Sequence, residues 1–125
     1  MLRNTVLIFL GCGGGGVARY WTSRVTHYFL GDAFPYGTLF VNVSGSLVMG
    51  FLLTLFITYS SGSMALRAFF LIGFLGGYTT FSSFSIETML LIERGATAHA
   101  LTNIVLSVIL CLMASWVGII LGRQL

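Results

Sequence analysis

The sequence predicts an all-α membrane protein with four transmembrane helices, the third of them broken. Of its 125 residues, 57% are hydrophobic and only 7% are charged, and the mean hydropathy is +0.99. Soluble domains carry about 25% charged residues. Four long apolar runs each approach or exceed the ~20 residues that a helix needs to cross about 30 Å of hydrocarbon. We therefore expect residues 1–125 to form a single four-helix transmembrane domain.

The first expected span covers residues 4–26 and has a glycine-rich centre. Its segment GCGGGGVARY holds five glycines, which favour close helix contact, and we interpret most of them as a packing seam. Arg19 closes the segment, and an arginine at membrane depth is costly unless it snorkels, pairs or faces water. Snorkelling beside Arg24 and His27 and a place in a water-filled vestibule are equal alternatives.

The second expected span covers residues 37–59 and follows the only proline, Pro35, because proline is tolerated where a helix starts. Asn42 and Ser46 are four residues apart and so share one helical face. An asparagine inside a span can hydrogen-bond a neighbouring helix or line a wet path. Of these two roles, we favour helix packing for an isolated asparagine.

The third expected span covers residues 65–92 and contains the unusual segment GFLGGYTTFSSFSIE. The run is longer than the ~20 residues that suffice to cross the bilayer, which predicts a tilt or a break. The adjacent pairs Gly76–Gly77 and Thr79–Thr80 are weak helix formers at mid-membrane depth. Non-helical backbone is tolerated there only where protein or water buries it. Such breaks aim free backbone groups at ions in membrane proteins.

Just beyond this break, Phe81 and Phe84 are three residues apart, so both rings project from one helical face. The hydroxyls of Ser82, Ser83 and Ser85 surround them, and Glu87 follows one turn later. We interpret the segment as part of an ion pathway, with Glu87 near a water-filled mouth.

The fourth expected span covers residues 97–121 and carries a narrow polar stripe. Its members recur every four residues: Asn103, Ser107, Cys111 and Ser115. Small hydroxyl side chains in a helix often bond only to their own backbone. Four polar residues in register on one otherwise apolar helix favour a polar track.

The six arginines are spread evenly between the two expected sides of the membrane. One side holds Arg3, Arg67 and Arg123, and the other holds Arg24, Arg94 and, if counted with its nearer end, Arg19. The positive-inside rule therefore gives almost no bias in orientation. A chain that inserts both ways can assemble as an antiparallel dual-topology homodimer, and two copies then supply the inverted repeat that larger transporters encode in one polypeptide. Scattered arginines without a basic patch do not favour a nucleic-acid partner.

Three of these segments together resemble motifs of the Fluc (CrcB-type) family of fluoride channels. They are GCGGGGVARY, PYGTLFVNVSGSLVMG and GFLGGYTTFSSFSIE, in the family's order, and the likeness covers essentially the whole chain. The resemblance implies an antiparallel dual-topology homodimer of four-helix subunits with two pores. It also implies a structural sodium ion (Na+) at the dimer interface, held by the backbone carbonyls of Gly76 and Thr79. Carbonyl oxygens suit a hard cation.

The resemblance also implies which side chains line the fluoride pathway. They are Phe81, Phe84, Asn42, Ser82, Ser83, Ser107, Glu87 and Arg19. The implied activity is passive, selective export of fluoride across the bacterial cytoplasmic (inner) membrane, which lowers cytoplasmic fluoride. The chain departs from the family where many members carry a tyrosine in place of Asn103 and a hydroxyl residue in place of Cys111.

Three other classes of protein fit the residues less well. A small multidrug-type exporter also has four spans, but it needs a carboxylate in its first span, and the acids here are Asp32, Glu87 and Glu93. A non-transporting scaffold subunit leaves the phenylalanine pair, the break and the polar stripe unexplained. An enzyme needs a base or a metal set beside a nucleophile, and scattered serines with two terminal histidines supply none.

Overall fold

The computed structural model describes residues 1–58 and 63–125, and the regular elements of these residues are helical. This agrees with the expected all-α class. The helices are α1 (Leu2–Leu30), α2 (Tyr36–Thr58), α3 (Met64–Arg67), the π-helix η1 (Ala68–Leu75), α4 (Gly76–Tyr78), α5 (Phe81–Glu93) and α6 (Thr97–Arg123). The third expected span is thus divided among α3, η1, α4 and α5.

Within residues 1–58 and 63–125, three stretches are long and apolar enough to cross a membrane: Tyr36–Thr58, Met64–Glu93 and Thr97–Arg123. These match three of the four expected spans, although the expected end of the second span at residue 59 lies outside the described residues. The helix α1 is 29 residues long and continues four residues past its expected end at residue 26. It does not reach the same hydropathy, because its glycines and its three arginines dilute the apolar residues. Length and composition therefore support three spans.

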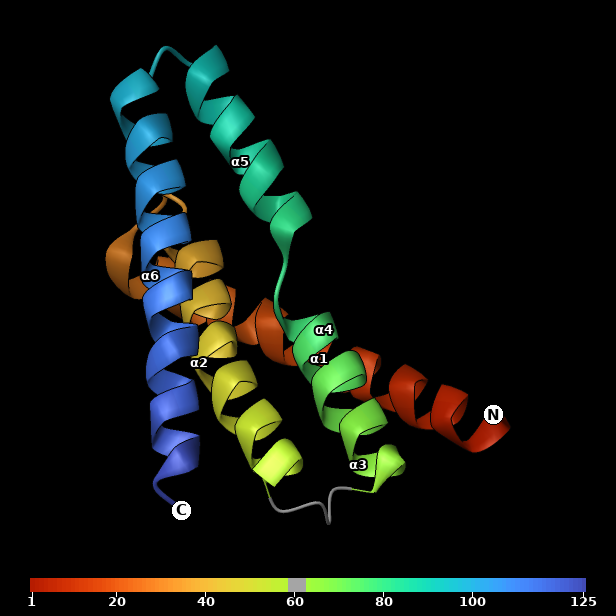
Figure 1. Cartoon of the computed structure of the whole chain (residues 1–125). Helices are drawn as coiled ribbons and strands as arrows, with labels where there is room; N and C mark the ends of the chain where they lie inside the picture. The colour runs from red at the N-terminus through yellow and green to blue at the C-terminus, as the bar shows by residue number, and fades with distance from the viewer. Residues whose placement is uncertain (59–62) are drawn as a thin grey trace.

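The third span is interrupted between α4 and α5, as the sequence predicts, but at the threonine pair alone. Thr79 and Thr80 are both extended, with φ/ψ of −79°/155° and −152°/117°, and they form the thin link between the two helices in Figure 1. Gly76 and Gly77 remain helical in α4. Gly77 serves a close approach instead, because a Cβ there would lie 2.5 Å from the carbonyl oxygen of Cys12 on α1.

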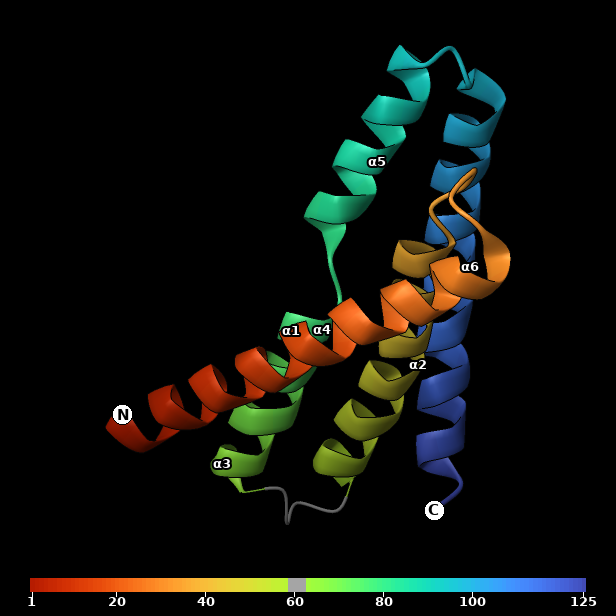
Figure 2. The same cartoon turned by 180° about the vertical axis from the view of Figure 1, so that it is seen from behind.

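Small residues let the helices approach closely in two places. The helices α2 and α6 run side by side in the same direction (Figure 1), and a Cβ on Gly118 would meet the carbonyl oxygen of Leu47. The helix α1 crosses the first half of the third span obliquely (Figure 2) through Gly11 and Gly15. The predicted seam in α1 is therefore confirmed for these two glycines. Gly13 and Gly16 make no such contact within the chain, because a Cβ at either would meet nothing within 4 Å.

Candidate functional site

The helix break is held in place by the side chain of Asn42 on α2. The Thr80 amide donates to Asn42 Oδ1 at 2.7 Å, and Asn42 Nδ2 donates to the Thr80 carbonyl oxygen at 2.9 Å. Thr80 is only 7% exposed, so both backbone groups lie where water cannot readily replace these bonds. Asn42 therefore has the packing role that we favoured for it, since its side-chain amide bonds the backbone of Thr80 in the extended link of the neighbouring span.

Thr80 also starts α5, because its side chain caps the new helix. Its hydroxyl oxygen accepts from the Ser83 amide at 3.1 Å, which satisfies one of the unpaired amides of the first turn. The same hydroxyl lies 3.1 Å from Ser83 Oγ and 3.2 Å from Ser82 Oγ. The threonine that breaks the span thus also organises the serine hydroxyls beside the break.

A cleft of about 430 Å³ lies between α2, the break and α6, and we call it the phenylalanine cleft. Phe81 and Phe84 line it with ring centroids 5.3 Å apart, which confirms that the two rings share one face. Its other lining residues are Asn42, Gly45, Ser46, Met49, Thr79, Thr80, Ser107, Val108, Cys111, Leu112 and Ser115. Four expected pathway residues, Asn42, Phe81, Phe84 and Ser107, therefore meet in one cavity.

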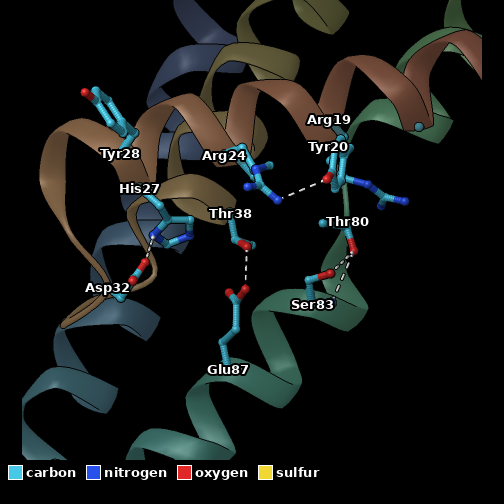
Figure 3. A pocket seen from close by; sticks show the side chains of 12 residues that line it. Arg19, Tyr20, Arg24, His27, Tyr28, Asp32, Thr38, Thr80, Ser83 and Glu87 are labelled. Atoms are coloured by element: carbon cyan, nitrogen blue, oxygen red, sulfur yellow. Dashed lines mark hydrogen bonds and ion pairs between the residues drawn. The ribbon is translucent and has the colours of Figure 1, made fainter.

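A second cavity, of about 710 Å³, lies on the other side of the break, and we call it the arginine cavity. Figure 3 shows its side chains, which come from α1, from the loop after it, from α2 and from α5. Its lining residues are Gly16, Arg19, Tyr20, Ser23, Arg24, His27, Tyr28, Asp32, Thr38, Thr80, Ser83 and Glu87. The two cavities share one lining residue, Thr80, so the helix break separates them.

Charged groups are concentrated in the arginine cavity. Arg24 Nη1 donates to the Tyr20 hydroxyl at 3.1 Å, and His27 Nδ1 lies 3.3 Å from Asp32 Oδ1. Arg19 lines this cavity from α1. Both places considered for its side chain, snorkelling and a vestibule, stay predictions. Arginines around a concave surface with low-dielectric walls raise the local concentration of anions.

Glu87 contributes a carboxylate to the same cavity, and Thr38 binds it. The Thr38 hydroxyl donates to Glu87 Oε1 at 2.7 Å, as Figure 3 shows, while Oε2 is buried with no partner among the described residues. Sequence reasoning missed Thr38. The signal was present, because Thr38, Asn42 and Ser46 recur every four residues and so form a polar stripe on α2 like the one on α6.

The carbonyls expected to hold sodium are both released from helical bonding. The Thr80 amide, which would bond Gly76 in a continuous helix, donates to Asn42 instead. The Thr79 carbonyl accepts only a long bond of 3.5 Å from Arg19 Nη1. Free carbonyls of this kind suit a hard cation, but two oxygens from one chain are fewer than such a cation requires. No group of three or more His, Cys, Asp or Glu able to hold a metal occurs within residues 1–58 and 63–125.

The remaining expected site residues are divided by the break or lie apart. Ser83, Glu87 and Arg19 line the arginine cavity, whereas Ser82 lines neither of the two cavities. The polar stripe of α6 is also divided. Ser107, Cys111 and Ser115 line the phenylalanine cleft, but Asn103 is 2% exposed and lies in neither cavity.

Comparison of the sequence with known proteins identifies the family of this chain. A family model described as "CrcB-like protein, Camphor Resistance (CrcB)" matches residues 6–119. The chain belongs to the CrcB-like family. Relatives from Coxiella burnetii (strain Dugway 5J108-111) and Trichlorobacter lovleyi are 55% and 44% identical, each over 98–99% of this chain and 99% of the relative. A relative from Methylococcus capsulatus is 51% identical over 94% of this chain and 52% of its own length. Each of these relatives is named "Fluoride-specific ion channel FluC".

Proposed function

We propose that this protein is a fluoride-selective ion channel that lets fluoride leave the cell passively. The observation that carries the proposal is the phenylalanine cleft, where Phe81 and Phe84 face the same cavity as Asn42 and Ser107. The edge of an aromatic ring carries the positive part of its quadrupole, so a ring edge can face a small anion. The full-length relatives named as fluoride-specific channels support the same ion.

The arrangement offers an anion a sequence of partners that replace its water. In the arginine cavity, Arg19 and Arg24 supply positive charge that attracts an anion, beside the carboxylates of Asp32 and Glu87. Ser83 and Thr80 offer hydroxyls at the break. In the phenylalanine cleft, Asn42 Nδ2 donates one of its two protons to the Thr80 carbonyl, and the second proton remains available to an anion. A narrow path of this kind favours fluoride over the larger chloride.

The proposal includes an antiparallel dual-topology homodimer in which each chain, as one four-helix domain, spans the membrane with α1 as its fourth span. The near-equal distribution of arginines supports insertion in both orientations. We further propose that a sodium ion lies at the interface of the two copies, held by the carbonyls of Gly76 and Thr79 from each. Two chains together would offer four oxygens. The ion would add positive potential near the pathway.

We place the protein in the cytoplasmic membrane of a bacterium as a multi-pass protein. The three apolar stretches support a membrane location. In a passive channel, the fluoride gradient itself drives export. The biological consequence is a lower cytoplasmic fluoride concentration.

Fluoride efflux from proteoliposomes that contain the purified protein tests this function directly. The vesicles are loaded with fluoride and chloride together, so that chloride serves as an internal control for leakage. Fast release of fluoride with chloride retained is the expected result. Fluoride retained in vesicles that hold well-folded protein would contradict the proposal. In that case, release of a guanidinium-like cation from separately loaded vesicles would favour a small multidrug-type exporter.

Replacing the rings tests the part of the proposal that depends on the phenylalanine cleft. We expect Phe81→Ile and Phe84→Ile each to reduce fluoride flux by roughly 2- to 10-fold, because isoleucine keeps bulk but removes the quadrupole. Phe40→Ile is the matched control, because Phe40 is an exposed phenylalanine of α2 that lines neither cavity. Unchanged flux in the first two variants would remove the rings from the mechanism.

A further inference from the structure

A buried chain of hydrogen bonds ties α5 to α6 beside the phenylalanine cleft. Ser107 Oγ donates to Asn103 Oδ1 at 3.4 Å, and Asn103 Nδ2 donates to Thr88 Oγ1 at 2.9 Å. Thr88 Oγ1 in turn donates to the Phe84 carbonyl oxygen at 2.7 Å. Asn103 and Thr88 are 2% and 6% exposed, so water does not compete for these groups. The two helices meet near the loop that joins them and diverge from there (Figure 1).

The direction of this chain follows from its last member. The Phe84 carbonyl can only accept, so the proton in the 2.7 Å contact must come from the Thr88 hydroxyl. The Thr88 oxygen is then left to accept, and among the Asn103 groups only the amide nitrogen can donate to it. This orients the Asn103 carbonyl oxygen toward Ser107 across a longer contact of 3.4 Å, in which the Ser107 hydroxyl is the only possible donor. The Phe84 carbonyl thus sets the direction of the chain of hydrogen bonds.

The consequence concerns the one member of the chain that lines the phenylalanine cleft. Ser107 does so, whereas Asn103 and Thr88 line neither cavity. With its proton directed at Asn103, the Ser107 hydroxyl presents lone pairs to the cleft, and an anion requires a donor. An anion in the cleft must therefore draw the proton away from Asn103.

We propose that Asn103 and Thr88 are positioning residues that weaken anion binding at Ser107 by competing for its hydroxyl proton. They act through Ser107 and do not touch the anion. The polar stripe of α6 therefore has two functions. The phenylalanine cleft is lined by Ser107, Cys111 and Ser115. Asn103 lies outside the cleft and acts on Ser107 through its hydrogen bond. The competition keeps fluoride from being held so tightly that it leaves slowly, since conduction needs binding weak enough for release. This inference rests on the proposed fluoride channel.

The test is the fluoride dependence of efflux from proteoliposomes, separated into a maximal rate and a half-saturating concentration. Thr88→Val removes the acceptor for the Asn103 amide with almost no change in shape. The amide can then turn its nitrogen toward Ser107 and release the proton. We expect the half-saturating fluoride concentration to fall by roughly 2- to 10-fold, the equivalent of one ordinary hydrogen bond. Thr88→Ser keeps the hydroxyl and should behave as the unaltered protein.

The decisive comparison repeats Thr88→Val in a Ser107→Ala background. Without the Ser107 hydroxyl, the valine should no longer change the half-saturating concentration, because Thr88 acts on Ser107 through Asn103. An equal change in both backgrounds, or a fall in maximal rate alone, would overturn the proposal and leave the chain a structural tie.

A second variant protects the test from misfolding. Asn103→Leu has a similar shape, removes the competing oxygen outright, and should lower the half-saturating concentration in the same way. An unchanged or raised value in a variant that remains folded would also overturn the proposal. Absence of fluoride flux in the unaltered protein is a different result, because it would refute the channel function rather than the role of Asn103.

Discussion

Replacing Asn42 by alanine isolates the bond pair that holds the broken helix. The change removes the acceptor for the Thr80 amide and one donor to the Thr80 carbonyl. Thr80 is 7% exposed and its φ/ψ is extended, so its amide has no helical carbonyl to turn to. The amide is left buried without a partner.

The magnitude follows from these two bonds. A buried amide left unsatisfied costs about 1–3 kcal/mol, and the lost bond to the carbonyl adds about 1 kcal/mol. Asn42→Ala should therefore favour local opening of the break by about 2–4 kcal/mol. Since 1.4 kcal/mol is a factor of ten, hydrogen exchange of the Thr80 amide should accelerate by at least about 30-fold.

Hydrogen–deuterium exchange of the purified protein in lipid nanodiscs measures this effect at the peptide that contains Thr80. Ser46→Ala is the matched control, because Ser46 lies one turn along α2 and lines the same cleft without a side-chain bond to the break. Exchange at Thr80 should be unchanged in that variant. If Asn42→Ala also leaves exchange at Thr80 unchanged, the side chain does not hold the break and its role lies elsewhere.

Two further predictions follow from helix packing and from charge. Gly118→Ala should lower stability by about 1–3 kcal/mol, because the new Cβ meets the carbonyl of Leu47. Gly13→Ala should leave stability unchanged, because a Cβ there meets nothing within 4 Å. Thermal unfolding of the two variants in detergent measures the difference. Arg19→Gln should lower fluoride flux by roughly 2- to 10-fold at low ionic strength, and the difference should shrink as the salt concentration rises. Fluoride efflux at several salt concentrations measures this effect. Arg3→Gln is the control and should have little effect, because Arg3 does not line the cavity.

Much of the fold was predictable because the membrane restricts what a chain can do. An apolar run in lipid must satisfy its own backbone, which leaves the helix as the regular choice. The expected starts of the second and fourth spans therefore lie within one residue of α2 and α6. The first span was harder to delimit, because glycines and arginines make its hydropathy signal weak, and α1 runs on to Leu30.

The position of the break could be predicted only approximately. Two pairs of weak helix formers, Gly76–Gly77 and Thr79–Thr80, were both candidates from local propensity. Only the threonine pair is non-helical in the structure. The side chain of Asn42 accepts from the Thr80 amide, whereas Gly77 stays helical and packs against the backbone of Cys12. Both partners are distant in sequence, and their positions follow from how α1 and α2 pack.

The sequence alone determined the membrane class, the helical spans, the presence of a break and the shared face of Phe81 and Phe84. Each of these depends on hydropathy, propensity or helical spacing, which act over a few turns of one chain segment. Only the tertiary structure decided that Thr38 binds Glu87, that Asn42 holds Thr80, and that Asn103 turns away from the cleft toward Thr88. A hydrogen bond has a range of about 3 Å, so its partner is chosen by which helices lie in contact, and that choice is made by packing.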